Sequence, residues 1–574
     1  MSVEIPPTDL FSYITSAGTP ISRQSPQYFD ATAPTANYTL QDAELMAKRV
    51  GYGLQKVMQL RKQDKVLLYS GNDLLFPIVV WGVTAAGGVF TGASPSASVY
   101  ELEYQLRDSE ATILITSMEG SKVAIEAARK AGLPVDRILL LVAPGIDDGH
   151  PGSIRPWTEI WGSSEEASLW PWDRISSVDE ARTTTAVINY SSGTTGLPKG
   201  VELTHYNIIA NAEQIIAKRL LVDNTEAGRA RRDRLKASSE RWLAAVPMYH
   251  AFGQSYFCVI APRLGAKVFI MPKFNLHQYL TFVDIYRITF VNVVPAMLAM
   301  LCNVEQPGRF NFKAIESMTS GAAPLDPTIA QRFRHRYLRD GVLVKQGWGM
   351  TETTSNLTGF TPDDQDDGRS IGWLSPNCKA RIVPVAGREF EGGAAAEGRL
   401  LGELWVAGPN VMKGYWKREA ETKDALMTEG EERWLRTGDI AYVDDRGCFY
   451  LVDRLKELIK VNGFQVSPTE LEKGLMAHRG VVDAAVVAYK KQGSEFPRAF
   501  VVRTSPSVTA EGLHAWIQER FARYKWLEGG IFFIEQIPRT ASGKVIRRQL
   551  PIPRNLDSRL RSGEGMDRRE SRGS

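Results

Sequence analysis

Residues 190–200 gather hydroxyl groups, glycines and a lysine in one short segment. The segment is Tyr190-Ser-Ser-Gly-Thr-Thr-Gly-Leu-Pro-Lys-Gly200, and it directly follows a strand-like run, residues 185–189. Hydroxyl groups, and backbone N–H groups beside glycines, can donate to phosphate oxygens, while Lys199 adds a positive charge. The segment differs from a Walker A loop, because Gly200 rather than Ser or Thr follows the lysine. The pattern therefore predicts a loop that binds phosphate groups.

A second segment, residues 346–354, places an aromatic ring, a hydroxyl group and a carboxylate within five positions. It is Gln346-Gly-Trp-Gly-Met-Thr-Glu-Thr-Thr354. Trp348 offers a flat aromatic face, Thr351 a hydroxyl group and Glu352 a negative charge. If Glu352 lies beside a triphosphate, a bound cation is required, because like charges otherwise repel each other.

Five further segments are weaker when each is considered alone. A single histidine in the apolar run 246–253 is usually a core residue, and Gly-Ala turns such as the one in residues 320–325 are common. Asp439 follows a glycine, the setting of an ordinary turn residue. The lysines of residues 453–465 and 538–548 have the setting of solvated surface side chains.

The elements that must position these segments alternate up to about residue 450. Short β-branched runs indicate strands at residues 65–69, 111–116 and 138–142, and longer periodic segments indicate helices at residues 41–61, 99–107 and 120–131. This alternation is typical of parallel sheets with helices on both faces. From residue 402 to 452 the pattern changes to hairpins, with a turn at residues 445–447.

The expected fold class is therefore α/β. We expect a large multi-layer N-terminal domain, residues 1–452, with parallel-rich sheets and a small hairpin-rich subdomain. A small, mobile α+β domain is expected at residues 453–550. Residues 551–574, which hold six arginines and little apolar matter, are interpreted as a flexible tail. The polar, basic residues 223–241 are interpreted as a solvated surface loop.

Composition excludes several classes of protein. Hydrophobic residues make up 43% of the chain and the net charge is only +4, which argues against disorder and against nucleic-acid binding. The four cysteines lie far apart, so neither structural zinc nor a disulfide framework is expected. The apolar stretch Leu74–Phe90 is interrupted by proline and glycines and is interpreted as a buried helix rather than a membrane span. Without a leader pattern or a C-terminal Ser-Lys-Leu, a cytoplasmic location is expected and a peroxisomal one stays open.

The chemical segments follow one another in the order typical of one family. Residues from about 40 to 550 resemble the adenylate-forming (AMP-binding) superfamily, and within it the acyl-CoA ligases similar to 4-coumarate:CoA ligase. The resemblance implies an AMP-forming acyl-CoA ligase that uses ATP, Mg²⁺ and coenzyme A. Such an enzyme converts a carboxylate and ATP to acyl-AMP and pyrophosphate, and then transfers the acyl group to CoA.

The resemblance also implies a role for individual residues. Trp348 would stack on adenine, Thr351 would bond to the α-phosphate, and Glu352 would hold Mg²⁺. The implied nucleotide and CoA contacts are Ser191, Ser192, Gly193, Thr194, Thr195, Gly196, Lys199, Gly321, Ala322, Gln346, Gly347, Trp348, Gly349, Thr351, Asp439, Arg454, Gly463 and Gln465. The implied catalytic residues are Lys544, His250, Thr351 and Lys460. The implied acyl pocket consists of Tyr249, His250, Gly321, Gly347, Ser355 and Asn356.

The family's second domain turns about a hinge, which the resemblance places at Lys456. In one orientation Lys544 would serve the adenylation step. In the other, Lys460 would serve thioester formation. Lysine suits the first task, because its compact ammonium group can bridge a carboxylate and a phosphate oxygen.

The sequence limits the range of candidate carboxylic acids but does not identify the acid. The 4-coumarate ligases carry Pro-Val where this chain has Ser355-Asn356, which disfavours a p-coumaroyl substrate. An aryl, heteroaryl or arylpropenoic acid is expected, and a medium-chain fatty acid is the alternative. Besides this small-molecule acid, a downstream acyltransferase or synthase is considered as a partner. Neither nucleic acid binding nor a membrane span is expected, and the oligomeric state is left open.

Two other classes of protein fit the sequence less well. An adenylation enzyme that loads an amino acid onto a carrier protein would need an acidic residue to pair with the ammonium group, and none lies between Val246 and Lys267. A non-catalytic nucleotide sensor would be expected to lack Lys199, Glu352 or Lys544, and all three are present.

Overall fold

The computed structural model divides into two compact units. One comprises Met1–Leu458 with Ala541–Gly543, and the other comprises Ile459–Thr540 with Lys544–Ser574. The structure describes residues 2–17, 20–145, 154–191, 197–221, 225–366, 368–385, 399–455, 457–461, 464–491, 494–521, 523–540 and 543–551. The division at Leu458 falls six residues after the domain limit predicted from the sequence, and the predicted tail lies outside the described residues except for Pro551.

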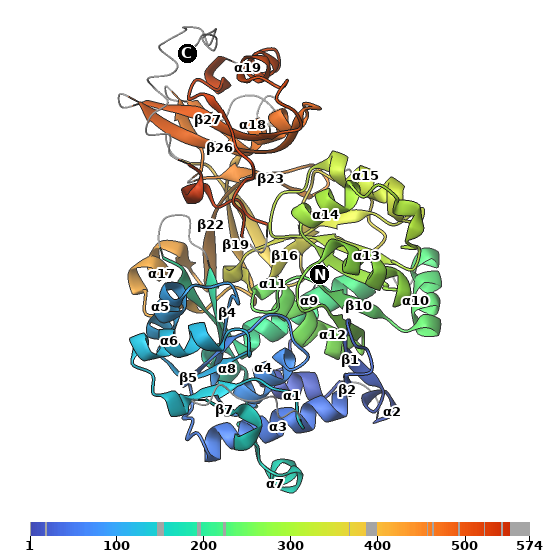
Figure 1. Ribbon diagram of the computed structural model, residues 1–574, viewed down its shortest axis with the longest axis vertical. Coiled ribbons are helices and arrows are strands. Elements are labelled where there is room, and N and C mark those ends of the chain that lie inside the picture. The colour runs from blue at the N-terminus through green and yellow to red at the C-terminus, as the bar shows by residue number, and fades with distance from the viewer. Residues whose placement is uncertain are drawn as a thin grey trace, which may run out of the picture. The chain divides into compact units, whose positions relative to one another are not determined.

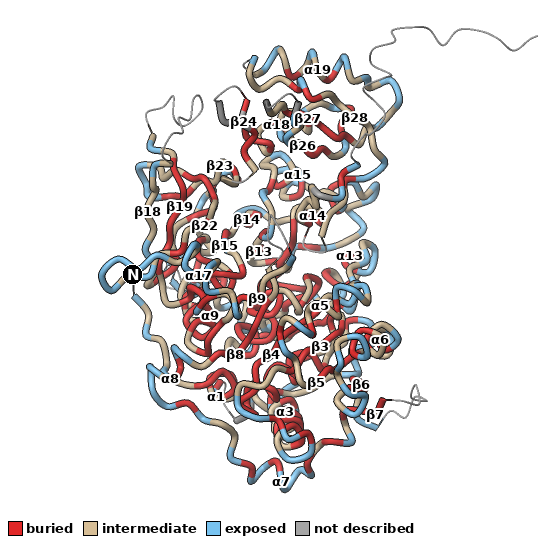
Figure 2. The backbone as a smooth tube through the Cα atoms, turned by 90° about the vertical axis from the view of Figure 1, so that its left-hand side faces the viewer, coloured by how far each residue is buried: buried red, intermediate tan, exposed pale blue. Residues whose placement is uncertain are grey.

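The first sheet of the large unit is mainly parallel and is deeply buried. Its order among the described residues is β20-β9-β8-β4-β3-β5-β6-β7. The strands are β3 (Lys65–Tyr69), β4 (Val89–Ala93), β5 (Ala111–Thr116), β6 (Ile138–Leu140), β7 (Arg155–Pro156), β8 (Thr185–Ser191), β9 (Lys199–Thr204) and β20 (Gly414–Tyr415). Figure 2 shows β3, β4 and β8 buried along most of their length, as their near-continuous apolar sequences predict.

Helices cover both faces of this sheet. They include α3 (Leu40–Lys56), α4 (Phe76–Ala85), α5 (Val99–Ser109) and α6 (Ser121–Ala131) (Figure 1). Because the chain moves from β3 to β4 in one direction and from β4 to β5 in the other, right-handed crossovers place α4 and α5 on opposite faces. The predicted alternation of strands and helices is thus confirmed, and the stretch Leu74–Phe90 forms the buried helix α4 and the start of β4.

A second sheet of the large unit has the order β14-β13-β12-β10-β11-β1-β2 and is parallel except at its β1–β2 edge. Its strands are β1 (Pro26–Asp30), β2 (Asn37–Thr39), β10 (Arg241–Ala244), β11 (Lys267–Ile270), β12 (Phe290–Val293), β13 (Ser317–Ser320) and β14 (Val344–Gln346). The helices linking them are α13 (Leu276–Ile285), α14 (Pro295–Cys302) and α15 (Pro327–Tyr337). The two mainly parallel sheets share one continuous apolar core.

Apart from α10, which is described below, the remaining helices of the large unit are short except for α9. They are α1 (Leu10–Thr15), α2 (Pro20–Arg23), α7 (Ser164–Leu169), α8 (Val178–Thr183), α9 (His205–Leu220), α11 (Ala251–Gly253), α12 (Ala261–Leu264) and α17 (Glu419–Ala425), with a π-helical segment at Gln254–Ile260. No described helix is both long enough and apolar enough to cross a membrane.

Antiparallel strands form the end of the large unit, as the hairpin pattern predicts. One sheet pairs β18 (Lys379–Val383), β19 (Gly402–Ala407), β22 (Glu432–Val443), β21 (Leu426–Glu429) and β23 (Phe449–Arg454). A smaller sheet consists of β15 (Trp348–Gly349), β16 (Asn356–Gly359) and β17 (Trp373–Leu374).

The second unit is α+β. Strands β26 (Val481–Lys491), β27 (Ser494–Arg503) and β28 (Ile531–Phe533) form its main sheet, and β24 (Ile459–Val461) pairs with β25 (Phe464–Val466). Helices α18 (Pro468–Met476) and α19 (Ala510–Gln518) contribute Leu471, Leu475, Leu513 and Ile517 to a core of its own.

The interpretation of residues 223–241 as a loop is wrong. The structure has a helix, α10 (Glu226–Ser238), whose first turn is capped by Thr225 accepting from Gly228 N at 2.9 Å. Arginine and lysine are good helix formers, so a polar, basic sequence can form a helix when tertiary contacts support it. Here Arg231 is buried against Asp363, and Arg234 pairs with Glu316 at 2.8 Å.

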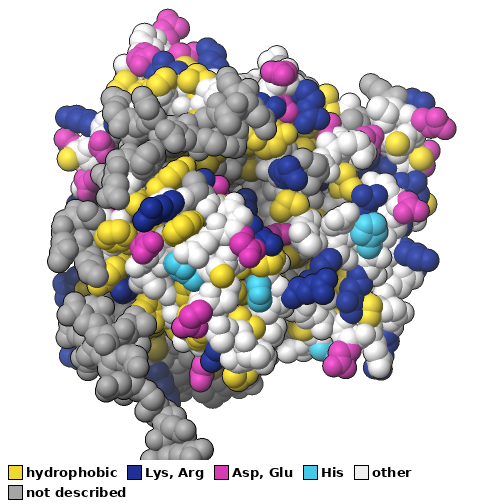
Figure 3. Space-filling view, turned by 90° about the horizontal axis from the view of Figure 1, so that it is seen from above, with side chains coloured by type: hydrophobic (Ala, Val, Ile, Leu, Met, Phe, Trp, Pro, Cys, Tyr) yellow, Lys and Arg dark blue, Asp and Glu magenta, His cyan; other side chains and the backbone are white. Residues whose placement is uncertain are grey.

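On one face of the molecule, basic and acidic side chains are mixed rather than separated (Figure 3). On the face shown in Figure 3, basic and acidic side chains lie interspersed, with hydrophobic side chains between them. This distribution agrees with the nearly balanced total charge.

Candidate active site

The stem of the predicted phosphate loop is a β-hairpin. Strands β8 and β9 are antiparallel, and Ser191 lies opposite Lys199. The predicted contacts Ser192, Gly193, Thr194, Thr195 and Gly196 lie outside the described residues. On the other side of β9, strand β20 brings Tyr415 opposite Val201, and the Lys199 ammonium lies 5.1 Å from the centre of the Tyr415 ring. A lysine and a tyrosine therefore lie together at the base of this loop.

Glu352 meets this stem through two hydroxyl groups. Ser191 Oγ donates to Glu352 Oε1 at 3.2 Å, and the Tyr415 hydroxyl donates to the same oxygen at 2.9 Å. Glu352 is buried. Burial and the neighbouring Glu352 carboxylate both raise the pKa of Tyr415, so its hydroxyl stays protonated and acts as a donor.

These contacts fit the predicted metal ion. Mg²⁺ is commonly held in proteins by one or two carboxylates together with substrate phosphates and waters. Glu352 supplies such a carboxylate, Lys199 supplies a nearby charge for phosphate oxygens, and Ser191 supplies a hydroxyl group.

Tyr415 is the site residue that sequence reasoning missed. It lies 63 positions after Glu352, and its contact depends on the short pairing of β20 with β9. No feature of the sequence around Tyr415 predicts that pairing.

Two glycines of the second motif are required by close backbone packing. A Cβ atom on Gly349 would lie 1.7 Å from the carbonyl oxygen of Ser355, and one on Gly347 would lie 2.6 Å from Asn356 Nδ2. The hairpin of β15 with β16 causes this crowding, since Gly349 pairs with Asn356. Thr351 follows in a buried 3₁₀ turn, directly before Glu352.

The residues predicted to hold adenine and ribose gather around one carboxylate. Trp348 Nε1 donates to Asp439 Oδ2 at 2.8 Å, and Arg454 Nε lies 3.0 Å from Asp439 Oδ1. Asp439 and Arg454 are paired positions of β22 and β23, and Asp439 is buried. The Asp439 carboxylate raises the pKa of Arg454 further, so the guanidinium stays charged. The fold thus unites three residues that are distant in sequence.

The loop after β13 has an unusual backbone. Ala322 has φ +70°, in the left-handed region that residues other than glycine rarely adopt. Gln346 Oε1 accepts from Leu325 N at 2.9 Å, and Gln346 Nε2 donates to the Gly368 carbonyl at 2.7 Å. Gln346 therefore ties this loop to a second segment instead of presenting both ends of its amide to a ligand.

Gly321 lies beside the histidine segment. A Cβ atom on Gly321 would lie 3.4 Å from the Phe252 ring, so this loop and residues 249–252 form adjoining walls. His250 Nδ1 accepts from Phe252 N at 3.4 Å, and burial lowers the pKa of His250, which keeps the imidazole neutral. The Tyr249 hydroxyl accepts from Ser94 Oγ at 3.4 Å.

The two residues that replace Pro-Val differ in their positions. Asn356 lines a cavity and donates through Nδ2 to the Tyr256 hydroxyl at 3.4 Å. Ser355 is buried, is not among the residues that line this cavity, and donates through Oγ to Asn356 Oδ1 at 3.3 Å. Asn356 therefore faces the cavity, while Ser355 supports it from behind.

The predicted residues of the second unit are described only in part. Thr540 and Lys544 close a turn, with Thr540 N donating to Lys544 O at 2.8 Å and Lys544 N donating to Thr540 Oγ1 at 3.1 Å. Lys460 and Gln465 are paired positions of β24 and β25. Lys456 and Gly463 lie outside the described residues.

The sequence matches two family models along most of its length. Residues 21–416 match the AMP-binding enzyme model, and residues 470–544 match the AMP-binding enzyme C-terminal domain. Together they include the segments 190–200, 346–354 and Lys544, whereas Asp439 and Arg454 lie between the two matches.

Curated relatives and solved structures agree with this match. A phenylacetyl-CoA ligase of Aspergillus niger is 33% identical over 559 residues, covering 96% of this chain and 98% of that protein. A peroxisomal OPC-8:0-CoA ligase of Arabidopsis thaliana is 33% identical, covering 86% of this chain and 84% of that protein. The ATP-bound crystal structure of MatB from Rhodopseudomonas palustris shares the fold, with a TM-score of 0.76 and 23% identity over 94% of this chain and 97% of that one.

The family, the fold class and the need for ATP, Mg²⁺ and CoA, each expected from the sequence, are thereby confirmed. The chain belongs to the AMP-binding enzyme family and is an AMP-forming acyl-CoA ligase.

Proposed function

We propose that this ligase activates an aryl-type carboxylic acid. The observation that carries the proposal is a cluster of aromatic rings beside the acyl residues. The ring centres of Phe252 and Tyr256 lie 5.3 Å apart, and those of Tyr256 and Phe290 lie 5.8 Å apart with the rings nearly parallel. Aromatic walls favour a flat, apolar acyl group. The phenylacetyl-CoA ligase among the relatives supports the same class of acid.

We assign the residues to two ends of the large unit. The phosphate end comprises Ser191, Lys199, Thr351, Glu352 and Tyr415. The acyl end comprises Tyr249, His250, Phe252, Gly321, Gly347 and Asn356.

The phosphate end provides the field for adenylation. The substrate carboxylate is its own nucleophile, so the protein must bring two anions together and neutralise the charge that develops on phosphorus. Lys199 and the Thr351 hydroxyl would contact phosphate oxygens, and Glu352 would hold Mg²⁺. When bound, Mg²⁺ supplies further positive charge to the phosphates.

A panel of acids tests the substrate class. Pyrophosphate release would be measured with CoA present for phenylacetate, benzoate, cinnamate, 4-coumarate and octanoate. We expect an aryl acid to give the highest kcat/KM. A clear preference for octanoate would instead support the medium-chain alternative, and acyl-AMP formation without transfer to CoA would support a carrier protein as acceptor.

The two lysines of the second unit are proposed to serve separate steps. We expect Lys544→Ala to lower acyl-AMP formation by about 10²-fold or more, and still to convert supplied acyl-AMP to acyl-CoA. Lys460→Ala should do the reverse. Lys490→Ala, at an exposed position of the same unit, is the control. Equal loss of both steps in both variants would contradict this division.

Domain limits at residues 452 and 550, a cytoplasmic location and a downstream acyltransferase or synthase stay predictions.

A further inference from the structure

A polar cavity of ≈ 60 Å³ lies next to the acyl end. It has room for about four water molecules at roughly 15 Å³ each, or for a small polar group. Gly347 and Asn356 line it, and Tyr256 forms part of its wall. Gly347 and Asn356 therefore belong both to the proposed acyl end and to the wall of this cavity.

Three basic side chains line the cavity, and no acidic side chain is among the lining residues. Lys218 and Lys345 approach it from α9 and β14, and Arg219 lies beside Lys218. Lys218 Nζ donates to the carbonyls of Gly359 and Trp373, at 2.9 and 2.5 Å. Burial lowers the pKa of Lys218 to about 8, because the charged ammonium group loses solvation there.

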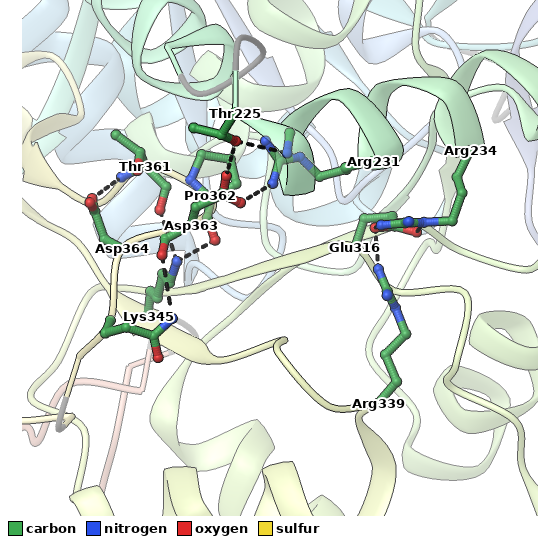
Figure 4. Close-up of polar contacts among 12 residues, drawn as sticks. Thr225, Arg231, Arg234, Glu316, Arg339, Lys345, Thr361, Pro362, Asp363 and Asp364 are labelled. Carbon is green, nitrogen blue, oxygen red and sulfur yellow. Dashed lines mark hydrogen bonds and ion pairs between the residues drawn. The ribbon is translucent and has the colours of Figure 1, made fainter.

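Lys345 is held in the same manner. It donates to the carbonyls of Thr361 and Pro362 at 2.8 and 2.6 Å (Figure 4), and burial lowers its pKa to about 8. An ammonium group has three N–H donors. With two donors of each lysine on described carbonyls, one donor of each is left for a group inside the cavity.

The nearby carboxylates are turned toward other partners. Asp363 accepts from Thr225 Oγ1 at 2.9 Å and pairs with Arg231, as Figure 4 shows. Asp364 accepts from Thr361 N at 2.5 Å. Glu240 pairs with Arg219. The segment 361–364 is therefore fixed on its outer side by α10 and on its inner side by Lys345, and its carboxylates do not line the cavity.

Unpartnered polar atoms lie on a strand beside the cavity. Both amide atoms of Asn292 are buried without a hydrogen bond of normal length and angle among the described residues, although Asn292 lies close enough to the Tyr256 hydroxyl to oppose the rise that burial causes in its pKa. Asn292 is on β12, two positions after the lining residue Phe290, so both side chains lie on the same face of the sheet. Buried polar atoms in this condition are costly unless a ligand or water satisfies them.

From the lining charges and donors we infer that the cavity receives a second anionic group of the substrate, so that the enzyme prefers an aryl acid with another carboxylate at the end remote from the reacting one. The inference rests on the proposed function of the acyl end. It adds a positively charged contact surface, made by the basic side chains, to a pocket whose other walls are aromatic. Carboxylate oxygens accept from ammonium and amide donors, and only an acceptor can use the donors that Lys218, Lys345 and Asn356 present.

Matched pairs of acids test this inference. ATP–pyrophosphate exchange would be measured for phenylacetate against 1,4-phenylenediacetate, benzoate against terephthalate, and hexanoate against adipate. The symmetric diacids present the same group whichever carboxylate reacts. We expect the diacid to have at least a tenfold higher kcat/KM in one or more pairs, because a site built for a polar group rejects an analogue that lacks it.

Variants then show whether the basic residues cause the preference. Lys345→Gln and Lys218→Gln should each lower the ratio of diacid to monoacid kcat/KM by about five- to tenfold. Lys130→Gln, at an exposed position of helix α6, is the matched control and should leave the ratio unchanged. A ratio measured on one preparation does not depend on the fraction of active enzyme, so partial misfolding does not obscure the result.

The outcomes separate the two proposals. A monoacid preferred in every pair, or a diacid preference unchanged in both lysine variants, would overturn the inference and make the lysines clamps for segment 361–364. Exchange with phenylacetate or benzoate would still support the proposed function in that case. No exchange with any acid would overturn both.

Discussion

The phosphate end and the polar cavity use basic residues in contrasting ways. At the phosphate end, Lys199 lies over the Tyr415 ring, and the only contacts described for Glu352 Oε1 come from two hydroxyl groups. In the cavity, Lys218 and Lys345 are bound to backbone carbonyls before any ligand arrives. The first arrangement is suited to a triphosphate that binds together with a cation and leaves as pyrophosphate. The second arrangement is suited to substrate selection, because a donor that is held in one position favours ligands whose acceptor reaches that position.

The largest effect in this comparison is expected at Glu352. Glu352→Gln removes the charge that would hold Mg²⁺, so kcat for adenylation should fall by about 10²–10³-fold and the Mg²⁺ requirement should rise. AMP affinity should change little, because AMP has no β- or γ-phosphate. Calorimetry with AMP and with MgATP checks this, with the exposed Glu165→Gln as control. Equal losses in both affinities would make Glu352 a structural residue.

At the acyl end, substitutions of Asn356 and of Ser355 should have different effects on substrate preference. Asn356→Val replaces a donor at the cavity wall, so the ratio of hydroxycinnamate to native-acid kcat/KM should rise by about 10–100-fold. Ser355→Ala changes a side chain that does not line the cavity and should alter that ratio by less than about threefold. The sequence alone gives both residues equal weight. Equal effects of the two substitutions would show that Ser355 also lines the pocket.

The buried lysines predict a dependence of stability on pH. The pKa of Lys345 is about 8 when folded and near 10.5 in its unperturbed state, so the folded chain binds fewer protons between these values. The contribution of Lys345 to the free energy of unfolding should therefore increase as pH rises through this range, by about 1–2 kcal/mol from pH 8 to 9.5.

The measurement is the Tm of the wild type minus that of Lys345→Met at several pH values, with Lys130→Met as control. The difference should move in favour of the wild type as pH increases. A difference independent of pH would mean that Lys345 has its ordinary pKa and is well solvated.

The smallest effect is expected from removal of the Tyr415 hydroxyl group, whose contact with Glu352 could not be predicted from the sequence. Tyr415→Phe removes one donor to Glu352 and keeps the ring beneath Lys199, so kcat/KM for MgATP should fall by about fivefold, the equivalent of one hydrogen bond. Tyr100→Phe, at an exposed position, is the control. If Tyr415→Phe and wild type share the same Mg²⁺ dependence, Tyr415 does not position Glu352.

Local patterns were enough to predict the elements and the stems of the site. The alternation around residues 65–116 follows from side-chain periodicity, and the phosphate-loop stem follows from a strand that ends in hydroxyl residues. The grouping of Trp348, Asp439 and Arg454 was reached only through the resemblance, since no local pattern connects residues so far apart.

The features that the sequence did not predict have one physical cause. Helix α10, the Tyr415 contact and the Lys218–Lys345 cavity are all made by tertiary contacts between segments distant in sequence. A lysine in an exposed helix and one bound to buried carbonyls have the same local sequence signature. Sequence periodicity therefore assigned the basic segment before β10 to solvent, although the fold uses it to fix the wall of a cavity.

The indole of Trp348 has a consequence for observing the enzyme at work. Its N–H group is bonded to the same Asp439 carboxylate that is proposed to receive the ribose hydroxyls. A nucleotide that binds there would change both the surroundings of the indole ring and the hydrogen-bond partner of its N–H group. Indole is a fluorophore, so both changes would alter its emission. A tyrosine at this position would carry no such N–H group, so Trp348 would act as an intrinsic optical reporter at the proposed nucleotide site, readable as the emission lost in Trp348→Tyr.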